Sequence, residues 1–422
     1  MDEHALDLYP RIVEALVVRE LLPTFPAILV VGPRGCGKST SMTRFADSVL
    51  DLSEPGTRLA AREDPDGILA SSMGTVLVDE WQEAPEILGA IKRAVDADTS
   101  GRAGRFIVAG SVRAAHQAAT WPGTGRLIRV RMYGLTQAER EGRSDYNPVD
   151  AFFRGELGFE RSEWGRSEYL ERIVGGRFPV VVRLEGRSRG RWYRAYIDQL
   201  VDRDAAQVAG RTVPSQKLRA VFDSCVARTG RELNKQATAG DAGVDFRTAD
   251  GYLDLLEALS VVARVPAWHT SRLQRLTRSP KVHVVDPGMA AYVLNLDGES
   301  LGRDATLVGQ LFETFVVTEL LAHIETATAD TSMFHLRDRD GKEVDIVLER
   351  HGRVVGLEAK SSTVVDRSDA RTLLWLRDRL GDAFTFGAVL YTGALPFAID
   401  DRVWALPISS LWRPPVPSGT QE

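Results

Sequence analysis

A glycine-rich loop followed by a lysine and a serine is the part of this chain best suited to bind a phosphate. Its sequence, Gly32-Pro33-Arg34-Gly35-Cys36-Gly37-Lys38-Ser39, has the spacing G-x-x-x-x-G-K-[ST]. An apolar run at 27–31 precedes the loop, and a helix-compatible run at 39–49 follows it. Glycines let successive backbone N–H groups converge on an anion, while Lys38 supplies charge and Ser39 a hydroxyl for Mg²⁺. We therefore expect nucleotide phosphates to contact Gly32, Pro33, Arg34, Gly35, Cys36, Gly37, Lys38, Ser39 and Thr40.

Two acids at the end of a later apolar run complete the expected nucleotide site. Asp79 and Glu80 follow Val76-Leu77-Val78. Asp79 can hold the Mg²⁺ shell, and Glu80 can polarise the water that attacks the terminal phosphate. Ser111, after the apolar run 106–109, is a candidate for contacting that phosphate or the water, and a simple turn serine is the alternative. Four arginines could complete a neighbouring subunit's site, and the sequence does not choose among them: Arg113, Arg126, Arg129 and Arg131.

A second set of chemical residues lies near the carboxyl end. Asp345 begins one predicted strand, and Glu358 and Lys360 end the next. Because alternate residues of a strand share a face, Glu358 and Lys360 point the same way, and a hairpin can bring Asp345 beside them. Two carboxylates and a lysine can bind a hard metal and activate water against a phosphodiester. The alternative is an exposed polar face with a surface ion pair.

The first of these regions resembles an AAA+ ATPase, and more specifically an uncharacterised prokaryotic AAA+ family. The motifs that carry the resemblance are the phosphate loop, Asp79-Glu80-Trp81-Gln82, Gly110-Ser111, Gly176-Arg177-Phe178-Pro179 and Val284-Val285-Asp286-Pro287-Gly288-Met289-Ala290. The resemblance covers nearly the whole chain. It implies ATP and Mg²⁺ as cofactors, ATP hydrolysis, and a winged-helix segment before the last region.

The last region resembles the PD-(D/E)xK nuclease superfamily. By that resemblance Asp345 and Glu358 would bind Mg²⁺ or Mn²⁺, and Lys360 would orient or deprotonate water. Glu313 matches the acid that such folds often carry on their first helix, so it is a further metal candidate. A fold of this kind can also keep these residues and serve only as a binding module.

Alternating apolar strands and helical patterns predict a mixed α/β chain. We expect an AAA+ P-loop core with a parallel sheet and an amino-terminal helix, then a helical linker with an arginine-rich loop at 183–194, a winged-helix-like domain and a smaller nuclease-like α/β domain. The winged helix is expected from helices at 215–228, 231–239 and 246–259 and a strand at 281–285. The segment 264–281 is basic, and within it the wing near Arg272–Lys281 is the better DNA candidate. The predicted boundaries are 1–145, 146–205, 206–300, 301–413 and a frayed tail at 414–422.

Composition narrows the class of protein. The chain is 44% hydrophobic and 26% charged, with net charge -5, so any attraction to nucleic acid must be local. Two cysteines give no disulfide framework, and we expect a cytoplasmic protein without a signal peptide or membrane span. Three functions remain open: an ATP-driven machine that gates a nuclease, an ATP-switched regulator that binds DNA or protein, and a signalling scaffold. ATP is the expected partner, DNA a candidate, and assembly into oligomers is compatible with the pattern.

Overall fold

A five-stranded parallel sheet forms the core of the amino-terminal part of the protein. The computed structural model describes residues 9–110, 125–156, 159–276, 278–338 and 340–414. The sheet has the strand order β2-β3-β4-β1-β5, and all of its pairs are parallel, as the sequence predicts. Its strands are β1 (Ala27–Val31), β2 (Ser48–Asp51), β3 (Val76–Asp79), β4 (Phe106–Gly110) and β5 (Leu127–Arg131).

Short helices surround this sheet. They are α1 (Ile12–Leu16), α2 (Leu22–Thr24), α3 (Lys38–Met42), α4 (Pro55–Glu63), α5 (Pro65–Ala70) and α6 (Glu86–Asp96), with a π-helical turn at Val17–Leu21. The helix predicted at 39–49 is wrong in length. Its helical residues end at Phe45, after a 3-10 turn at Thr43–Phe45, because Ser48 already pairs with Val76 in the sheet. Strand pairing thus overrides the helix propensity of this segment.

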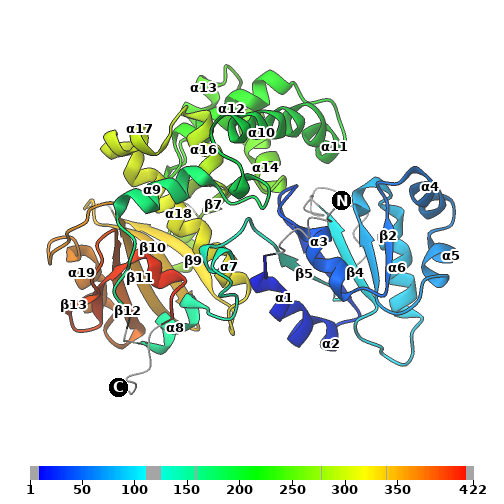
Figure 1. Cartoon of the computed structure of the whole chain (residues 1–422), viewed down its shortest axis with the longest axis horizontal. Coiled ribbons are helices and arrows are strands. Elements are labelled where there is room, and N and C mark those ends of the chain that lie inside the picture. Colours follow the sequence, from blue (N-terminus) through cyan, green and yellow to red (C-terminus); the bar gives the residue numbers. More distant parts are fainter. Residues whose placement is uncertain (1–8, 111–124, 157–158, 277, 339, 415–422) are drawn as a thin grey trace, which may run out of the picture.

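A largely helical segment follows the parallel sheet, and its last two helices lie in the upper part of Figure 1. It contains α7 (Gln137–Arg140), α8 (Pro148–Arg154), α9 (Arg166–Gly175), α10 (Gly186–Gln199), a π-helical turn (Leu200–Asp204) and α11 (Ala205–Ala209). The arginine-rich segment expected to be a loop is helical instead, since α10 begins at Gly186. Its Tyr193 and Ile197 are buried, so the arginines lie around a helix that packs by its apolar face. The segment holding α8 packs on the carboxyl-terminal sheet, where Phe152 stacks on Phe386.

Further helices and a small antiparallel sheet follow. The elements are α12 (Ser215–Ala227), β6 (Arg231–Glu232), α13 (Lys235–Asp241), α14 (Phe246–Ala258), β7 (Val262–Val265), α15 (Arg272–Arg275), β8 (Lys281–Val284), α16 (Pro287–Val293) and α17 (Gly298–Arg303). The strand order is β6-β8-β7. The helix expected at 231–239 therefore starts only at Lys235, after a short strand.

The carboxyl-terminal part is a six-stranded mixed sheet. A long helix, α18 (Ala305–Glu325), precedes it, and the other elements are β9 (Ser332–Arg337), β10 (Glu343–Arg350), β11 (Arg353–Lys360), α19 (Arg371–Leu380), β12 (Phe384–Tyr391), β13 (Phe397–Asp400) and β14 (Val403–Pro407). The order is β13-β14-β12-β11-β10-β9, in which β9, β10 and β11 are antiparallel and β11 and β12 parallel. His351 and Gly352, between β10 and β11, both have positive φ, as a two-residue hairpin turn requires.

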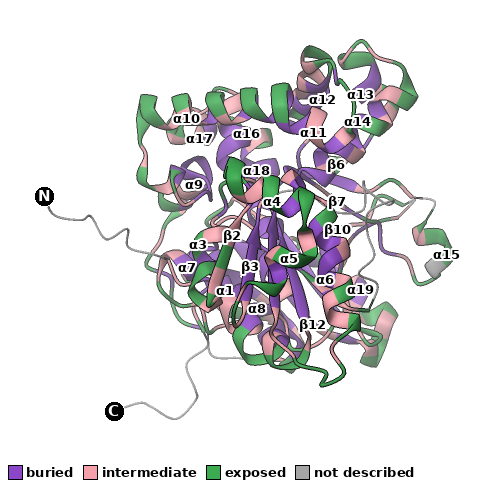
Figure 2. Cartoon of the chain, turned by 90° about the vertical axis from the view of Figure 1, so that its right-hand side faces the viewer, coloured by how far each residue is buried: buried purple, intermediate pink, exposed green. Residues whose placement is uncertain are grey.

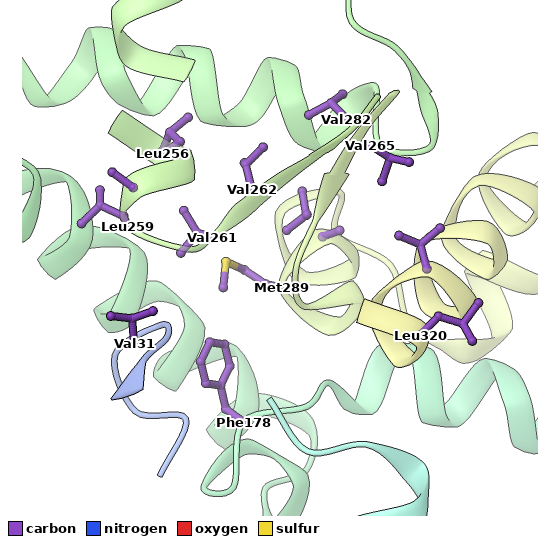
Figure 3. Close-up of a cluster of buried hydrophobic side chains, with 14 of the residues drawn as sticks. Val31, Phe178, Leu256, Leu259, Val261, Val262, Val265, Val282, Met289 and Leu320 are labelled. Carbon is purple, nitrogen blue, oxygen red and sulfur yellow. The ribbon is translucent and has the colours of Figure 1, made fainter. Parts of the chain in front are cut away.

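One continuous hydrophobic core links these parts. Figure 3 shows Val31 of β1, Phe178, Met289 of α16 and Leu320 of α18 around the same cluster. Figure 2 shows the strands mostly buried and the outer faces of α4 and α10 exposed. By length and composition α18 could cross a bilayer, but 72% of its apolar window is buried inside the protein, so it is a core helix.

A buried arginine joins three regions of the chain. Arg177 is 1% exposed, its backbone N–H donates to Asp286, and its Nε donates to the Leu135 carbonyl at 2.9 Å. Its Nη2 lies 3.4 Å from the carboxylate of Glu319, a wholly buried residue of α18. The two later motifs of the family resemblance therefore meet, because Arg177 and Asp286 belong to one each.

Replacing Glu319 by glutamine should lower the free energy of unfolding by about 3 kcal/mol. The substitution keeps the shape of the side chain but leaves a buried guanidinium without its counter-charge. Urea denaturation followed by circular dichroism measures the change. The control is Glu299→Gln, because Glu299 pairs with Arg303 on the surface, where both side chains are 76% exposed. Losing this surface pair should change the free energy of unfolding by less than about 0.5 kcal/mol. Equal effects of the two substitutions would contradict the role of Glu319.

Candidate functional site

The loop between β1 and α3 has the backbone shape that its glycines allow. Gly35 and Gly37 have φ of +74° and +100°, values that L side chains rarely adopt. At Gly32 a Cβ atom would lie 2.0 Å from the carbonyl oxygen of Met132. Geometry therefore requires all three glycines of the motif: Gly35 and Gly37 because of their positive φ, and Gly32 because of the close approach of Met132.

Lys38 lies folded onto this loop. Its side chain is buried, and Nζ donates to the carbonyl oxygens of Gly32 and Pro33 at 3.0 Å each. Both acceptors belong to the loop that would surround a phosphate. The ammonium is thus held at the phosphate position by weak neutral acceptors, which an anion's charged oxygens can outcompete.

Asp79 and Ser39 are in hydrogen-bond contact across the end of the sheet. Burial raises the pKa of Asp79, and the hydrogen bond with Ser39 opposes that rise. A hydroxyl and a carboxylate side by side next to a phosphate loop are an oxygen donor pair that fits Mg²⁺. Ser39 and Asp79 are therefore the residues that would hold Mg²⁺.

Glu80 has an unusual backbone conformation. Its φ is +51°, in the left-handed region that is uncommon for a glutamate. The side chain of Gln82 donates to its carboxylate, and burial raises the pKa of Glu80. Gln82 is the last residue of the Asp-Glu-Trp-Gln motif, so the structure gives that motif a role in orienting Glu80. Strain of this kind is typical of functional sites.

The amino-terminal segment supports the loop through Arg11, which sequence reasoning missed. This 5% exposed residue donates from Nη1 to the Cys36 carbonyl at 2.6 Å and from Nη2 to the Tyr133 carbonyl at 2.7 Å. Its Nε lies 3.0 Å from Glu139. Arg11 thus fixes the loop against the segment that follows β5. The only sequence signal is an arginine before an apolar helical run, which does not reveal a partner 25 residues away.

The residues expected near the γ-phosphate are only partly within the described residues. Ser111 and Arg113 lie outside the described residues. Arg126 pairs with Asp96, on the helix α6. The backbone N–H of Arg131, at the end of β5, donates to Glu325 of α18 at 2.6 Å.

A cavity of about 340 Å³ opens beside the loop. Gly37 and Thr40 of the loop line one side of it, and Leu135, Val180 and Leu184 contribute apolar walls. At its edge the guanidinium of Arg183 lies 5.3 Å from the centre of the Tyr9 ring. The cavity adjoins the expected phosphate position and has the apolar character that a planar base requires.

The helical region contacts the same loop. Arg34 Nη1 lies 3.0 Å from Asp204 Oδ1, in the π-helical turn after α10. Gln207 of α11 donates to Glu83 at 3.0 Å, just after the Asp79-Glu80 motif. The ring of Trp192 lies 3.9 Å from the position of a Cβ on Gly35. The loop is therefore enclosed by the helical region as well as by its own sheet.

The carboxyl-terminal residues singled out from the sequence come together, but around a lysine. Glu313 of α18, Asp345 of β10 and Glu358 of β11 lie in one buried cluster, with Lys360 3.8 Å from Glu358. Lys281 of β8 reaches into the same cluster. Its Nζ lies 2.9 Å from Glu313, 2.8 Å from Glu343 and 3.4 Å from Asp345. Neither Lys281 nor Glu343 was assigned to this site from the sequence.

This arrangement does not fit a bound divalent cation as it stands. The ammonium of Lys281 lies where the carboxylates converge. Burial and the neighbouring Asp345 raise the pKa of Glu358, which disfavours the charged carboxylate that a metal ion would need. Within the described residues no three His, Cys, Asp or Glu side chains form a ready metal site. The expected metal roles of Glu313, Asp345 and Glu358 thus have no support in this conformation.

Comparison with known proteins identifies the first region. Residues 24–141 match the model of an AAA domain, residues 166–300 that of a domain of unknown function (DUF8612) and residues 308–411 that of another domain of unknown function (DUF4143). The chain therefore carries an AAA-type ATPase domain, which agrees with its P-loop and parallel sheet. That part of the predicted resemblance is confirmed.

Relatives and solved structures add little about function. The uncharacterized proteins Mb2031c of Mycobacterium bovis and Rv2008c of Mycobacterium tuberculosis are each 26% identical over 406 residues, covering 93% of this chain and 82% of the relative. A RuvB variant of Thermotoga maritima has a TM-score of 0.28 at 17% identity, covering 62% of this chain and 87% of its own. Protein VC1899 of Vibrio cholerae has a TM-score of 0.20 at 10% identity, covering 91% and 95%. At such scores the fold assignment rests on the strand order and the AAA match.

Replacing Arg11 by lysine should weaken nucleotide binding about tenfold, or about 1.4 kcal/mol. Lysine keeps a charge beside Glu139 but cannot donate in the planar fork that reaches both the Cys36 and the Tyr133 carbonyls. Titration with a fluorescent ATP analogue measures the affinity. Arg303→Lys is the control, because Arg303 pairs with Glu299 on the surface and both side chains are 76% exposed. Affinity unchanged by the Arg11 substitution would contradict its support of the loop.

Proposed function

We propose that the protein is an ATP-binding and ATP-hydrolysing switch whose nucleotide state controls a nucleic-acid-binding surface on its middle region. The contact between Ser39 and Asp79 beside the lysine of the phosphate loop carries the first part of this proposal. The AAA match over residues 24–141 supports it.

Binding of ATP follows from the loop and the cavity beside it. The backbone of Gly35 to Lys38 would surround the phosphates, and Lys38 would leave its two carbonyl acceptors for the phosphate oxygens. Thr40, with the apolar walls formed by Val180 and Leu184, would hold the nucleoside in the adjoining cavity. Both parts of the ligand thus find chemically suitable surroundings on neighbouring elements.

Hydrolysis would depend on Asp79 and Glu80. Ser39 and Asp79 would hold Mg²⁺, which neutralises charge on the phosphates when it is bound with ATP. Glu80, fixed by its left-handed backbone and by Gln82, would orient and polarise the attacking water. Gln82 would act as a positioning residue through its hydrogen bond to Glu80.

The contact between Arg34 and Asp204 supports the switch. Arg34 belongs to the phosphate loop, and its partner lies at the end of the long helix α10. A triphosphate at the loop would compete with Asp204 for this guanidinium, because phosphates accept bidentate hydrogen bonds from arginine. ATP would therefore bind more tightly when Asp204 has released Arg34 than when the two are paired. Such a difference in affinity between two arrangements is what a ligand-driven change requires.

A broad groove on the middle region supports nucleic acid as the partner. The groove, about 970 Å³, is lined by the cations Arg231, Lys235, Arg278 and Arg337 and by the carboxylates of Glu232 and Glu343. Lys281 also lines it, but its charge is buried and paired within the protein. Phe246 lines it as well and is 46% exposed, so its ring can stack on an unpaired base. Leu276, 83% exposed, adds an apolar contact surface. The order of helices and strands around β6, β7 and β8 is compatible with the expected winged helix.

Part of the basic segment expected to bind DNA is engaged within the protein. Arg264 pairs with Asp254 and Glu257, and Arg275 lies 2.7 Å from Glu349 of the carboxyl-terminal sheet. The groove residues Arg231, Arg278 and Arg337 are therefore better candidates than the segment as a whole. The lysine within the acidic cluster favours a binding role for the carboxyl-terminal region over cleavage.

Glu80→Gln should retain ATP binding and lower the turnover number by at least about 100-fold, because the amide cannot polarise water as the carboxylate does. Lys38→Ala, in contrast, should abolish binding itself. Phosphate release and analogue titration separate the two effects. Glu86→Gln, on the exposed first turn of α6, should change neither. Normal turnover in the Glu80 variant would remove this residue from the mechanism.

Charge reversal in the groove should weaken nucleic-acid binding. We expect Arg278→Glu with Arg337→Glu to lower the affinity for a single-stranded oligonucleotide at least tenfold at moderate salt, because two phosphate contacts become repulsive. Fluorescence anisotropy with and without ATP measures this. The control is Arg93→Glu, on helix α6, where Arg93 pairs with Asp66 at the surface.

The same mixtures also test cleavage. Incubated with Mg²⁺ or Mn²⁺, single- and double-stranded DNA and RNA should remain intact. Cleavage that Asp345→Ala and Lys360→Ala both abolish would contradict the binding role and support the nuclease instead.

A further inference from the structure

The acidic cluster of the carboxyl-terminal sheet already contains a cation, supplied by another region of the chain. Glu313, Glu343 and Asp345 come from α18 and β10, within the segment 308–411. Lys281 comes from β8, within the segment 166–300. An ammonium has three N–H donors, and each of these three carboxylates lies within 3.4 Å of it.

The surroundings keep this lysine charged. Its side chain is 2% exposed. Burial alone opposes the charge, but Glu313, Asp345 and Glu343 together raise the pKa of Lys281 well above its usual range. A buried ammonium with three carboxylate partners is a compensated charge, whereas the carboxylates without it would be an uncompensated acidic cluster.

A buried histidine gives a second, independent indication that the position suits a cation. His283 is wholly buried, two residues after Lys281 on the same face of β8, and its Nδ1 bonds to Thr314. Its Nε2 lies 3.8 Å from the Glu313 carboxylate and has no hydrogen-bond partner among the described residues. Nε2 is therefore a further nitrogen turned toward the cluster.

We propose that Lys281 acts as a built-in cation that occupies a latent divalent-metal position, closing the acidic site and tying β8 to the carboxyl-terminal sheet. Oxygen donors from Glu313, Glu343 and Asp345, with His283 beside them, form the position. The lysine fills it with one positive charge in place of two. The inference goes beyond the proposed function, since it requires neither ATP hydrolysis nor binding of nucleic acid.

Position and strand pairing explain why the lysine stays in place. In β8 Lys281 pairs with Glu232 of β6 and Val265 of β7, so its backbone is fixed by a strand on each side. The chain after β7 also pairs with β9, through the Trp268 N–H and the His335 carbonyl. Exchange of Lys281 for a metal ion therefore requires the small sheet to move away from the large one.

Removing the ammonium should uncover the metal position. Nucleotide-free protein is titrated with Mn²⁺, and binding is followed by electron paramagnetic resonance. The unmodified chain and its Asp345→Asn variant should bind Mn²⁺ equally, which means that no saturable site depends on Asp345. Lys281→Met should bind one Mn²⁺ per chain at least tenfold more tightly. Added Mn²⁺ should also raise the melting temperature of this variant but not that of the unmodified protein. Lys342→Met is the control, because Lys342 pairs with Asp338 and Asp340 outside the cluster.

A folding-safe variant keeps the test decisive. Should Lys281→Met fail to fold in the absence of metal, Lys281→Met with Glu313→Gln removes one acid along with the cation and leaves Glu343, Asp345 and Glu358 as donors. The inference is overturned if the variant that folds binds Mn²⁺ no better than the unmodified chain, or if the unmodified chain already binds it through Asp345. Loss of ATP or oligonucleotide binding in separate assays would bear on the proposed function and leave this result unaffected.

Discussion

A single buried guanidinium sets the arrangement of the whole molecule. Arg177 contacts the Leu135 carbonyl next to the ATPase sheet, Asp286 at the start of α16 and Glu319 in the middle of α18. An arginine at 1% exposure is stable only where each partner is held in position. Separating the three regions would leave this buried charge without its partners. The continuous hydrophobic cluster around Phe178 adds to the same constraint. The parts behave as one body, and a change at one site has to be accommodated at the others.

How well the sequence predicted each feature depended on the distance between the residues involved. The phosphate loop, Asp79 and the parallel strands were recognisable because their information is local: glycines with positive φ, a following lysine, and apolar runs of strand length. The helix expected at 39–49 and the arginine-rich loop were wrong. In the first case strand pairing ended the helix, and in the second a buried stripe of Tyr193 and Ile197 stabilised one. Local propensity cannot foresee either outcome.

Long-range polar contacts were the main omission. Arg11 with Cys36, Arg34 with Asp204, and Lys281 with Glu313 join residues that are 25, 170 and 32 positions apart. Lys281 was counted with a basic segment, and its position in a buried strand, between apolar neighbours, was the available sign that its charge had an internal partner. Glu313, Asp345, Glu358 and Lys360 do gather as the nuclease resemblance implies. What the sequence could not show was that a lysine from outside the region would lie among them.

Helix α18 carries acidic contacts to every part of the protein at regular intervals. Glu313 meets Lys281 of the small sheet, Glu319 meets Arg177, and Glu325 accepts from the backbone of Arg131 on the strand beside the phosphate loop. The first and last of these acids are twelve residues apart, or about 18 Å along the helix axis. A buried α-helix of this length resists bending, so a displacement at its Glu325 end is carried along its axis to Glu313. The stiffness of α18 thus couples the strand next to the nucleotide loop to Lys281 and the acidic cluster of the carboxyl-terminal sheet. This coupling would not require any loop between the two sites to change its conformation.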